Sequence, residues 1–94
     1  MLFRSERENI LKAFRANVPA VHAEDGCIEY GAVVDLSPAA SFQAPIGPDT
    51  FMVIEKWASM DALKAHAASP HMATYAARTR PLIAQRAVHI LQAA

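Results

Sequence analysis

The sequence predicts a single α+β domain. Some stretches of the chain repeat apolar residues at helical spacing, and others alternate apolar and polar residues as half-buried strands do. The length of 94 residues fits one folded unit, since domains usually run ~100–150 residues. Twenty residues are alanine, the best helix former, which favours closely packed helices. We therefore expect residues 1–94 to form one domain with helices packed on a sheet.

The first expected element is a helix over Ser5–Glu24. Ser5 and Glu8 have the spacing of a capping box, in which each side chain bonds the backbone N–H of the other residue. The apolar residues of this stretch recur at helical spacing: Ile10, Leu11, Phe14, Val18 and Val21. Pro19 predicts a kink or the last turns of the helix, and Gly26 supplies the left-handed residue that ends it.

Three stretches predict strands. Cys27–Leu36 alternates, and Thr50–Ala58 carries large apolar residues on both faces over its first half, so both faces should be covered. The intervening Ser37–Asp49 contains three prolines and a glycine, which indicates a long loop. Arg86–Gln92 alternates again and is expected to be the last strand.

Two helices are expected between the second and third strands. Ser59 has the position of an N-cap for a short helix that ends near Ala67. Ser69 is followed by a proline at the first helical position, which predicts a helix over Pro70–Ala84. Pro81 should bend or interrupt this helix.

The resulting order is helix, strand, strand, helix, helix, strand. It lacks one strand, before the first helix, of the ferredoxin-like βαββαβ sandwich. Met1–Phe3 are the residues available for that strand, and they are too few. We expect that the natural chain begins upstream of Met1 or that part of it is not represented, which intact mass of the native protein would test.

Composition excludes several classes of function. Nine Lys and Arg balance nine Asp and Glu without a run of like charge, so no nucleic-acid footprint is present. No apolar stretch reaches the ~18–20 residues that cross a membrane, and the charged start is unlike a signal peptide. Cys27 is the single cysteine and cannot form an internal disulfide, which favours a reduced, cytoplasmic protein. No glycine-rich phosphate loop, dinucleotide motif or cysteine pair for a metal is found.

Three segments carry a family resemblance in order along the chain. Glu24–Tyr30 reads E-x-G-C-x-x-Y, Glu55–His66 reads E-x-W-x-S-x-x-A-L-x-x-H, and Ser69–Met72 reads S-x-H followed by an apolar residue. These segments resemble the motifs of antibiotic biosynthesis monooxygenase domains. The Ser37–Asp49 loop looks longer than is usual in that family.

The resemblance implies a dimeric α+β barrel, in which two ferredoxin-like subunits place their sheets face to face. A homodimer is therefore expected, and it would cover the second apolar face of the strand over Thr50–Ala58. The resemblance also implies a cofactor-independent monooxygenase that oxidises a small aromatic phenol or quinol with O2 to a quinone. The expected partners are that substrate and O2, with no cofactor or metal, no nucleic acid and no membrane.

Two residues are candidates for the chemistry. His66 is the best candidate for the base, because a neutral imidazole suits proton removal near pH 7; it could also be a partly exposed helix residue. Trp57 could donate its indole N–H to the substrate oxygen or form a pocket wall. Four further residues are candidates for substrate contact, with core or surface positions as the alternative: His71, Tyr30, Phe51 and Tyr75.

Other interpretations remain open from the sequence. The fold could serve a non-catalytic dimer that binds a small molecule. Haem degradation by some relatives needs a helix histidine, and the residues 73–77 that follow Met72 contain none. A metal pair of His66 and His71 would need further ligands. Glu55 lies on an otherwise apolar strand face and should find a partner, such as an Arg or Lys across the dimer.

Overall fold

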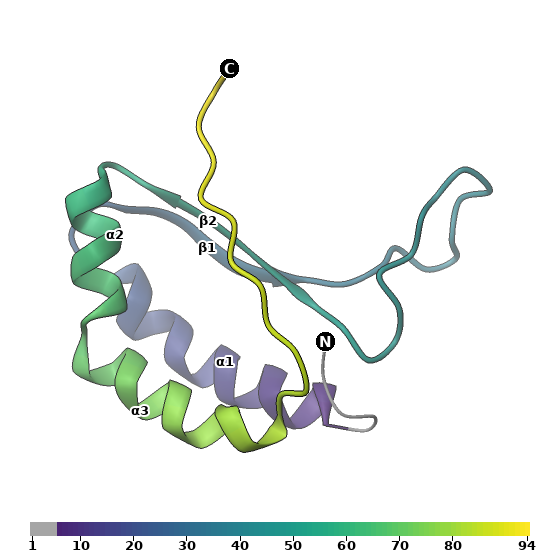
Figure 1. Ribbon diagram of the computed structural model, residues 1–94, viewed down its shortest axis with the longest axis horizontal. Helices are drawn as coiled ribbons and strands as arrows, with labels where there is room; N and C mark the ends of the chain where they lie inside the picture. Colours follow the sequence, from purple (N-terminus) through teal and green to yellow (C-terminus); the bar gives the residue numbers. More distant parts are fainter. Residues whose placement is uncertain (1–5) are drawn as a thin grey trace.

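The computed structural model describes residues 6–94, which form helices packed on one face of a two-stranded sheet (Figure 1). The elements in chain order are α1 (Arg7–His22), β1 (Cys27–Val33), β2 (Met52–Trp57), α2 (Met60–Ala67), α3 (Pro70–Thr79) and the 3-10 turn η1 (Arg80–Leu82). This arrangement confirms the α+β prediction. Helices α1 and α3 lie side by side under the sheet, and α2 connects the sheet to α3 (Figure 1).

The sheet is an antiparallel pair whose register separates a helix-facing side from an outer side. Tyr30 pairs with Glu55 and Ala32 with Val53, and these residues face the helices. The outer side carries three apolar residues that the helices leave exposed: Val33, Met52 and Ile54. Both faces of β2 are apolar over its first half, but the predicted cover of both faces is not seen within the chain, because Met52 and Ile54 are 49% and 44% exposed.

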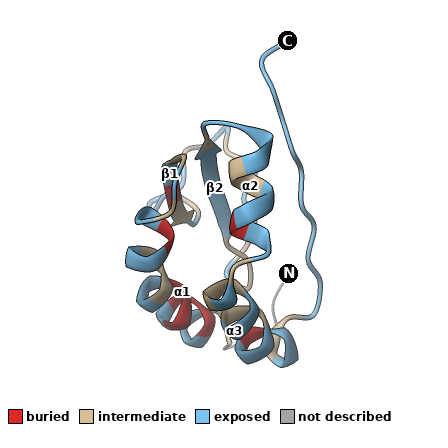
Figure 2. Cartoon of the chain, turned by 90° about the vertical axis from the view of Figure 1, so that its left-hand side faces the viewer, coloured by how far each residue is buried: buried red, intermediate tan, exposed pale blue. Residues whose placement is uncertain are grey.

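The core lies between α1 and the helix-facing side of β1. Phe14, Val21 and Tyr30 are buried together, with the Phe14 and Tyr30 rings stacked at a centroid distance of 5.0 Å. Phe51 and Tyr75 each meet the Phe14 ring edge-on at 6.2 Å. Figure 2 shows that the buried residues concentrate on the inner side of α1. The apolar residues that recur at helical spacing in the sequence are therefore the ones that pack against the rest of the fold.

Helix α1 begins later than predicted, at Arg7, with Glu6 in the N-cap position. Ser5, which the sequence predicts to cap this helix, and Met1–Phe3, expected to be too few for a first strand, lie outside the described residues. Pro19 lies in the last turns of α1, as predicted, and its missing N–H leaves the Arg15 carbonyl without its α-helical hydrogen bond.

The starts of α2 and α3 confirm their predicted positions. Ser59 caps α2 by accepting a hydrogen bond from the Ala62 N–H at 3.1 Å. Ser69 occupies the N-cap of α3, although its hydroxyl bonds elsewhere. Helix α3 ends at Thr79, five residues before the predicted end, because Pro81 cannot continue the α-helical hydrogen bonding and a 3-10 turn follows.

The predicted strand over Arg86–Gln92 is wrong. These residues run as an exposed extended tail, and Val88 and Ile90 are 64% and 63% exposed (Figure 1). Alternating residues make a strand only where another strand offers backbone hydrogen bonds. In the described part of the chain, only β1 and β2 pair to form a sheet, so the tail has no ladder to join.

The predicted loop over residues 37–49 is confirmed. Hydrogen bonds link its second half to Asp35, which lies just before the loop. The Asp35 carboxylate accepts hydrogen bonds from the N–H groups of Ile46 and Gly47, each at 2.9 Å. These two backbone bonds hold the pKa of Asp35 below its ordinary value. The ends of the loop are thereby drawn together beside the sheet.

No helix among residues 6–94 is long and apolar enough to cross a lipid bilayer.

Gly26 is the position where backbone geometry constrains the sequence most tightly. It has a φ of +80°, and a Cβ added there would lie 2.7 Å from the Ala62 Cβ. Its carbonyl also accepts a hydrogen bond from the Ala58 N–H at 2.8 Å, so the turn is held against the end of β2. Glycine is therefore required between α1 and β1.

We predict that Gly26→Ala lowers the free energy of unfolding by about 1–3 kcal/mol, from left-handed strain and the contact with Ala62. The measurement is urea unfolding at a fixed protein concentration. Gly31→Ala is the matched control, because a Cβ at Gly31 meets no atom within 4 Å. Equal stabilities of the two variants would contradict the assignment.

Candidate functional site

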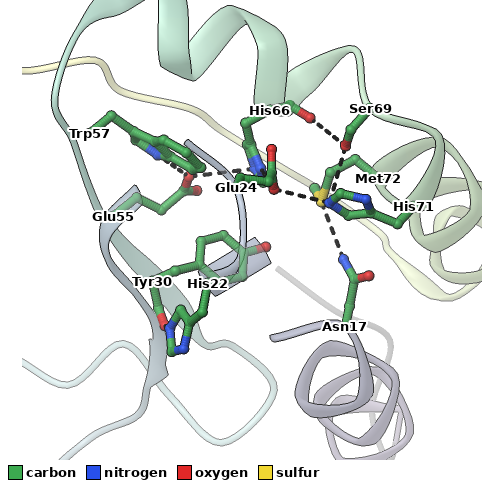
Figure 3. Close-up of polar contacts among 10 residues, drawn as sticks. All are labelled: Asn17, His22, Glu24, Tyr30, Glu55, Trp57, His66, Ser69, His71 and Met72. Carbon is green, nitrogen blue, oxygen red and sulfur yellow. Dashed lines mark hydrogen bonds and ion pairs between the residues drawn. The ribbon is translucent and has the colours of Figure 1, made fainter. Parts of the chain in front are cut away.

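A single carboxylate oxygen links three helical segments. The Oε2 atom of Glu24, just after α1, lies 2.8 Å from Nδ1 of His66 in α2 and 3.0 Å from Nε2 of His71 in α3 (Figure 3). Ser69, between these two helices, donates its hydroxyl to the His66 carbonyl at 2.8 Å and lies 3.2 Å from His71 Nε2. We call Glu24, His66 and His71 the Glu24 cluster.

The network defines which ring nitrogens carry protons. A carboxylate only accepts hydrogen bonds, so His66 Nδ1–H and His71 Nε2–H are both donors to Glu24. The Ser69 hydroxyl hydrogen is donated to the His66 carbonyl, so the Ser69 oxygen can only share the one His71 Nε2–H that also reaches Glu24, at 3.2 Å against 3.0 Å. In the neutral His66 ring, Nε2 then carries the lone pair and is the nitrogen able to accept a proton.

The Nε2 edge of His66 faces residues of the sheet. The Oε1 atom of Glu55 lies 3.7 Å from Nε2, beyond hydrogen-bond distance, and accepts the Trp57 indole N–H at 2.9 Å. The Trp57 ring lies over the His66 ring with a centroid distance of 4.6 Å, and Tyr30 meets it edge-on at 5.4 Å (Figure 3). The imidazole is therefore held between two carboxylates and two aromatic rings.

Burial and hydrogen bonding shift the pKa values of Glu24 and Tyr30 in this region. His66 is 4% exposed, and Glu24 is 15% exposed. Burial acts to raise the pKa of Glu24, but the hydrogen bonds from His66 and His71 outweigh it and the net direction is downward. Burial also raises the pKa of Tyr30, with a further rise from the Glu55 charge, so Tyr30 stays a neutral phenol. Glu24 is thus a carboxylate fixed on His66.

The predicted site residues divide between this region and two nearby cavities. His66, Trp57, Tyr30 and His71 come together around Glu24. A cavity of about 270 Å³ between α1 and α3 is lined by His71 and Tyr75, among others. A second, of about 230 Å³ between α1 and β1, is lined by Tyr30.

Phe51 is half-buried beside the core, and its contact with substrate stays a prediction. It packs on Phe14, and neither of the two cavities has it in its wall. Cys27 is partly buried against the core, and burial raises the pKa of its thiol.

Sequence reasoning missed the residue that organises the cluster. Glu24 was noted as part of a turn motif, and only the fold places it beside histidines 42 and 47 residues away. Glu55 was expected to meet an Arg or Lys across a dimer. In the structure it accepts the Trp57 N–H and faces His66, so the indole N–H is already engaged within the chain.

The arrangement is suited to proton transfer from a weak acid. Glu24 orients His66 through Nδ1, and a proton accepted at Nε2 would give an imidazolium lying between two carboxylates. The aromatic rings of Trp57 and Tyr30 limit water on the same side.

Comparison with known proteins agrees with the sequence motifs. Residues 4–78 match the model of the family described as antibiotic biosynthesis monooxygenase. The chain is 36% identical over 86 residues to the probable quinol monooxygenase YgiN of Escherichia coli K12, an alignment that covers 92% of this chain and 82% of YgiN.

Solved structures support the fold. A conserved protein from Methanosarcina mazei Go1 superposes with a TM-score of 0.74 at 16% identity, over 90% of this chain and 75% of that chain. Rv0793 from Mycobacterium tuberculosis superposes with a TM-score of 0.71 at 21% identity, over 100% of this chain and 91% of that chain. At these identities the likeness establishes the ferredoxin-like α+β fold.

We predict that neutral His66 is the Nδ1–H tautomer, because Glu24 accepts its proton. Long-range ¹H–¹⁵N correlation spectra of the imidazole rings distinguish the two tautomers directly. Glu24→Gln should abolish this preference, whereas His89→Gln in the exposed tail should leave the His66 signals unchanged. An Nε2–H tautomer in the unaltered protein would contradict the network.

Proposed function

Since the chain belongs to the antibiotic biosynthesis monooxygenase family, we propose that it is a cofactor-independent monooxygenase of a small aromatic phenol or quinol. Family membership and the similarity to a probable quinol monooxygenase support a monooxygenase-type function. The substrate class rests on the geometry around His66.

The observation that carries the proposal is the orientation of His66. Its Nδ1–H is fixed on Glu24 at 2.8 Å, and the ring lies against Glu55, Trp57 and Tyr30, with Nε2 toward Glu55. A phenolic hydroxyl can donate to Nε2 while its ring lies among the aromatic side chains. Phenols are weak acids near neutral pH, so removal of their proton calls for a base positioned within hydrogen-bond reach.

The proposed reaction balances in atoms and electrons. His66 removes the phenolic proton, and the electron-rich phenolate gives electrons to O2. One oxygen atom bonds to a ring carbon that carried hydrogen, and the other leaves as water. The balance is phenol plus O2 to quinone plus water, or quinol plus O2 to hydroxyquinone plus water.

Substrate reaches Nε2 from the Glu55 side. The Glu55 side chain is 31% exposed, whereas His66 is nearly covered. The 3.7 Å between Nε2 and Oε1 is too long for a hydrogen bond, so a hydroxyl placed there breaks no bond to Nε2. In this arrangement Glu24 positions the base and Trp57 forms a wall of the site.

The proposed active form is a homodimer that joins the outer faces of two sheets. Val33, Met52 and Ile54 are 43%, 49% and 44% exposed on that face, and α1 and α3 cover the opposite face. A second copy would bury these residues, as the dimeric α+β barrel of the family implies.

For activity, we predict that His66→Ala lowers kcat/KM by ~10²–10⁴-fold, the usual contribution of a general base. His71→Ala should reduce it less, because His71 meets Glu24 but lies away from Nε2. His89→Gln is the matched control and should retain full activity. The measurements are O2 uptake and quinone absorbance with a panel of phenols and quinols.

Two results would contradict this assignment. One is His66→Ala turning over at the unaltered rate. The other is His71→Ala losing more activity than His66→Ala, which would move the reaction to the cavity between α1 and α3.

For assembly, we predict that Ile54→Asp converts a dimer into a monomer, because a carboxylate would be buried in the interface. Sedimentation equilibrium measures the mass. Phe42→Asp is the control, since Phe42 is 92% exposed in the loop and lies off the sheet. A monomeric unaltered protein, or a dimeric Ile54→Asp variant, would contradict the dimer.

A further inference from the structure

We propose that the Glu24 cluster is a binding site for a divalent transition-metal ion of the Zn²⁺ class. Two imidazoles and one carboxylate converge, and their nearest ligand atoms all lie within 4.8 Å of one another. Two histidines and a carboxylate are an established ligand set for such ions, with a further position left to water.

The ligand spacing is close to what the ion requires. Zn²⁺ sits ~2.0–2.1 Å from its ligand atoms, so tetrahedral ligands lie ~3.3–3.4 Å apart. In the structure Glu24 Oε2 lies 2.8 Å from His66 Nδ1 and 3.0 Å from His71 Nε2. These two contacts need to open by roughly half an ångström, and the ligand nitrogens of the two imidazoles, which lie within 4.8 Å of each other, complete the set.

The charge around the cluster also favours a cation. Glu24 and Glu55 flank His66, and within residues 6–94 no Lys or Arg lies at ion-pair distance from either carboxylate. Histidines are their ion-pair partners, and neutral histidines leave the negative charge uncompensated. A divalent ion would supply that compensation.

Glu55 is placed as the outer partner of the site. When a metal replaces the proton on His66 Nδ1, the neutral ring carries its proton on Nε2, which faces Glu55 Oε1 at 3.7 Å. A metal-bound histidine usually donates its other N–H to a carboxylate, a backbone carbonyl or a water, and the 3.7 Å separation has to shorten for Glu55 to accept that bond. Trp57 in turn holds Glu55 through its indole N–H at 2.9 Å.

The ion has a route to the site from solvent. The His71 and Glu24 side chains are 30% and 15% exposed, whereas His66 is 4% exposed. His71 and Glu24 therefore form the open edge, and His66 forms the buried end. An ion captured there would be held at the junction of α1, α2 and α3.

Metal binding has a consequence that rests on the proposed function. With the ion on Nδ1, the ring proton moves to Nε2, and that nitrogen can no longer accept a proton from a phenol. The same cluster would then have two forms. In the metal-free form His66 Nε2 can accept a proton, and in the metal-bound form it cannot. Zn²⁺ would act as an inhibitor of the oxidation.

The test is calorimetric titration of the full chain with Zn²⁺ at neutral pH, without substrate. We expect one ion per chain, with affinity lower by ~100-fold in His71→Gln and by ~10–100-fold in Glu55→Gln. His89→Gln, which removes an exposed histidine elsewhere, should bind like the unaltered protein. Circular dichroism confirms that each variant is folded.

The ring ¹⁵N spectra give a second readout that needs no activity. Zn²⁺ should convert His66 from the Nδ1–H to the Nε2–H form. No binding, binding that His71→Gln leaves unchanged, or equal losses in His89→Gln would overturn the site. A protein that binds Zn²⁺ in this way and oxidises no phenol would retain the metal site and refute only the proposed function.

Discussion

The shared hydrogen bonding of the Glu24 carboxylate is the interaction on which the rest of the site depends. It joins the end of α1 to residues in α2 and α3, and it fixes the ring of His66. Partial burial of a carboxylate is costly unless it is hydrogen-bonded, and two imidazole N–H groups offset that cost at Glu24. The fold can therefore keep a charged group inside a small domain, and the charge gives His66 its orientation.

The surrounding fold brings these groups together. Gly26 allows a sharp turn from α1 into β1 directly after Glu24, and the turn is close enough to α2 to touch Ala62. Ser69 ends α2 and begins α3 in a short link that places His66 and His71 on one carboxylate. The aromatic core of Phe14, Tyr30 and Tyr75 then fixes α1 and α3 against the sheet.

Local sequence patterns predicted most of the helices and strands, because each of these patterns involves residues that are close together in the sequence. The Ser59 cap, the Ser69-Pro70 start and the alternation of β1 each involve residues a few positions apart. The tail over Arg86–Gln92 has the same alternation and is not a strand, since pairing depends on a distant neighbour that alternation does not report. His66 and Trp57 were found through family motifs, whereas the contacts of Glu24 span more than 40 residues and come only from the fold.

The central claim is that Glu24-oriented His66 takes the proton of a bound phenol, and a chromogenic nitrophenol tests it without O2. The unaltered protein and the Glu24→Gln and His66→Ala variants are titrated at a pH where the free phenol is mostly protonated. Binding to the unaltered protein should produce the absorbance of the phenolate, and both variants should bind the phenol with little or no colour change. A bound phenol that stays protonated in the unaltered protein, or a phenolate that persists in His66→Ala, would contradict the account.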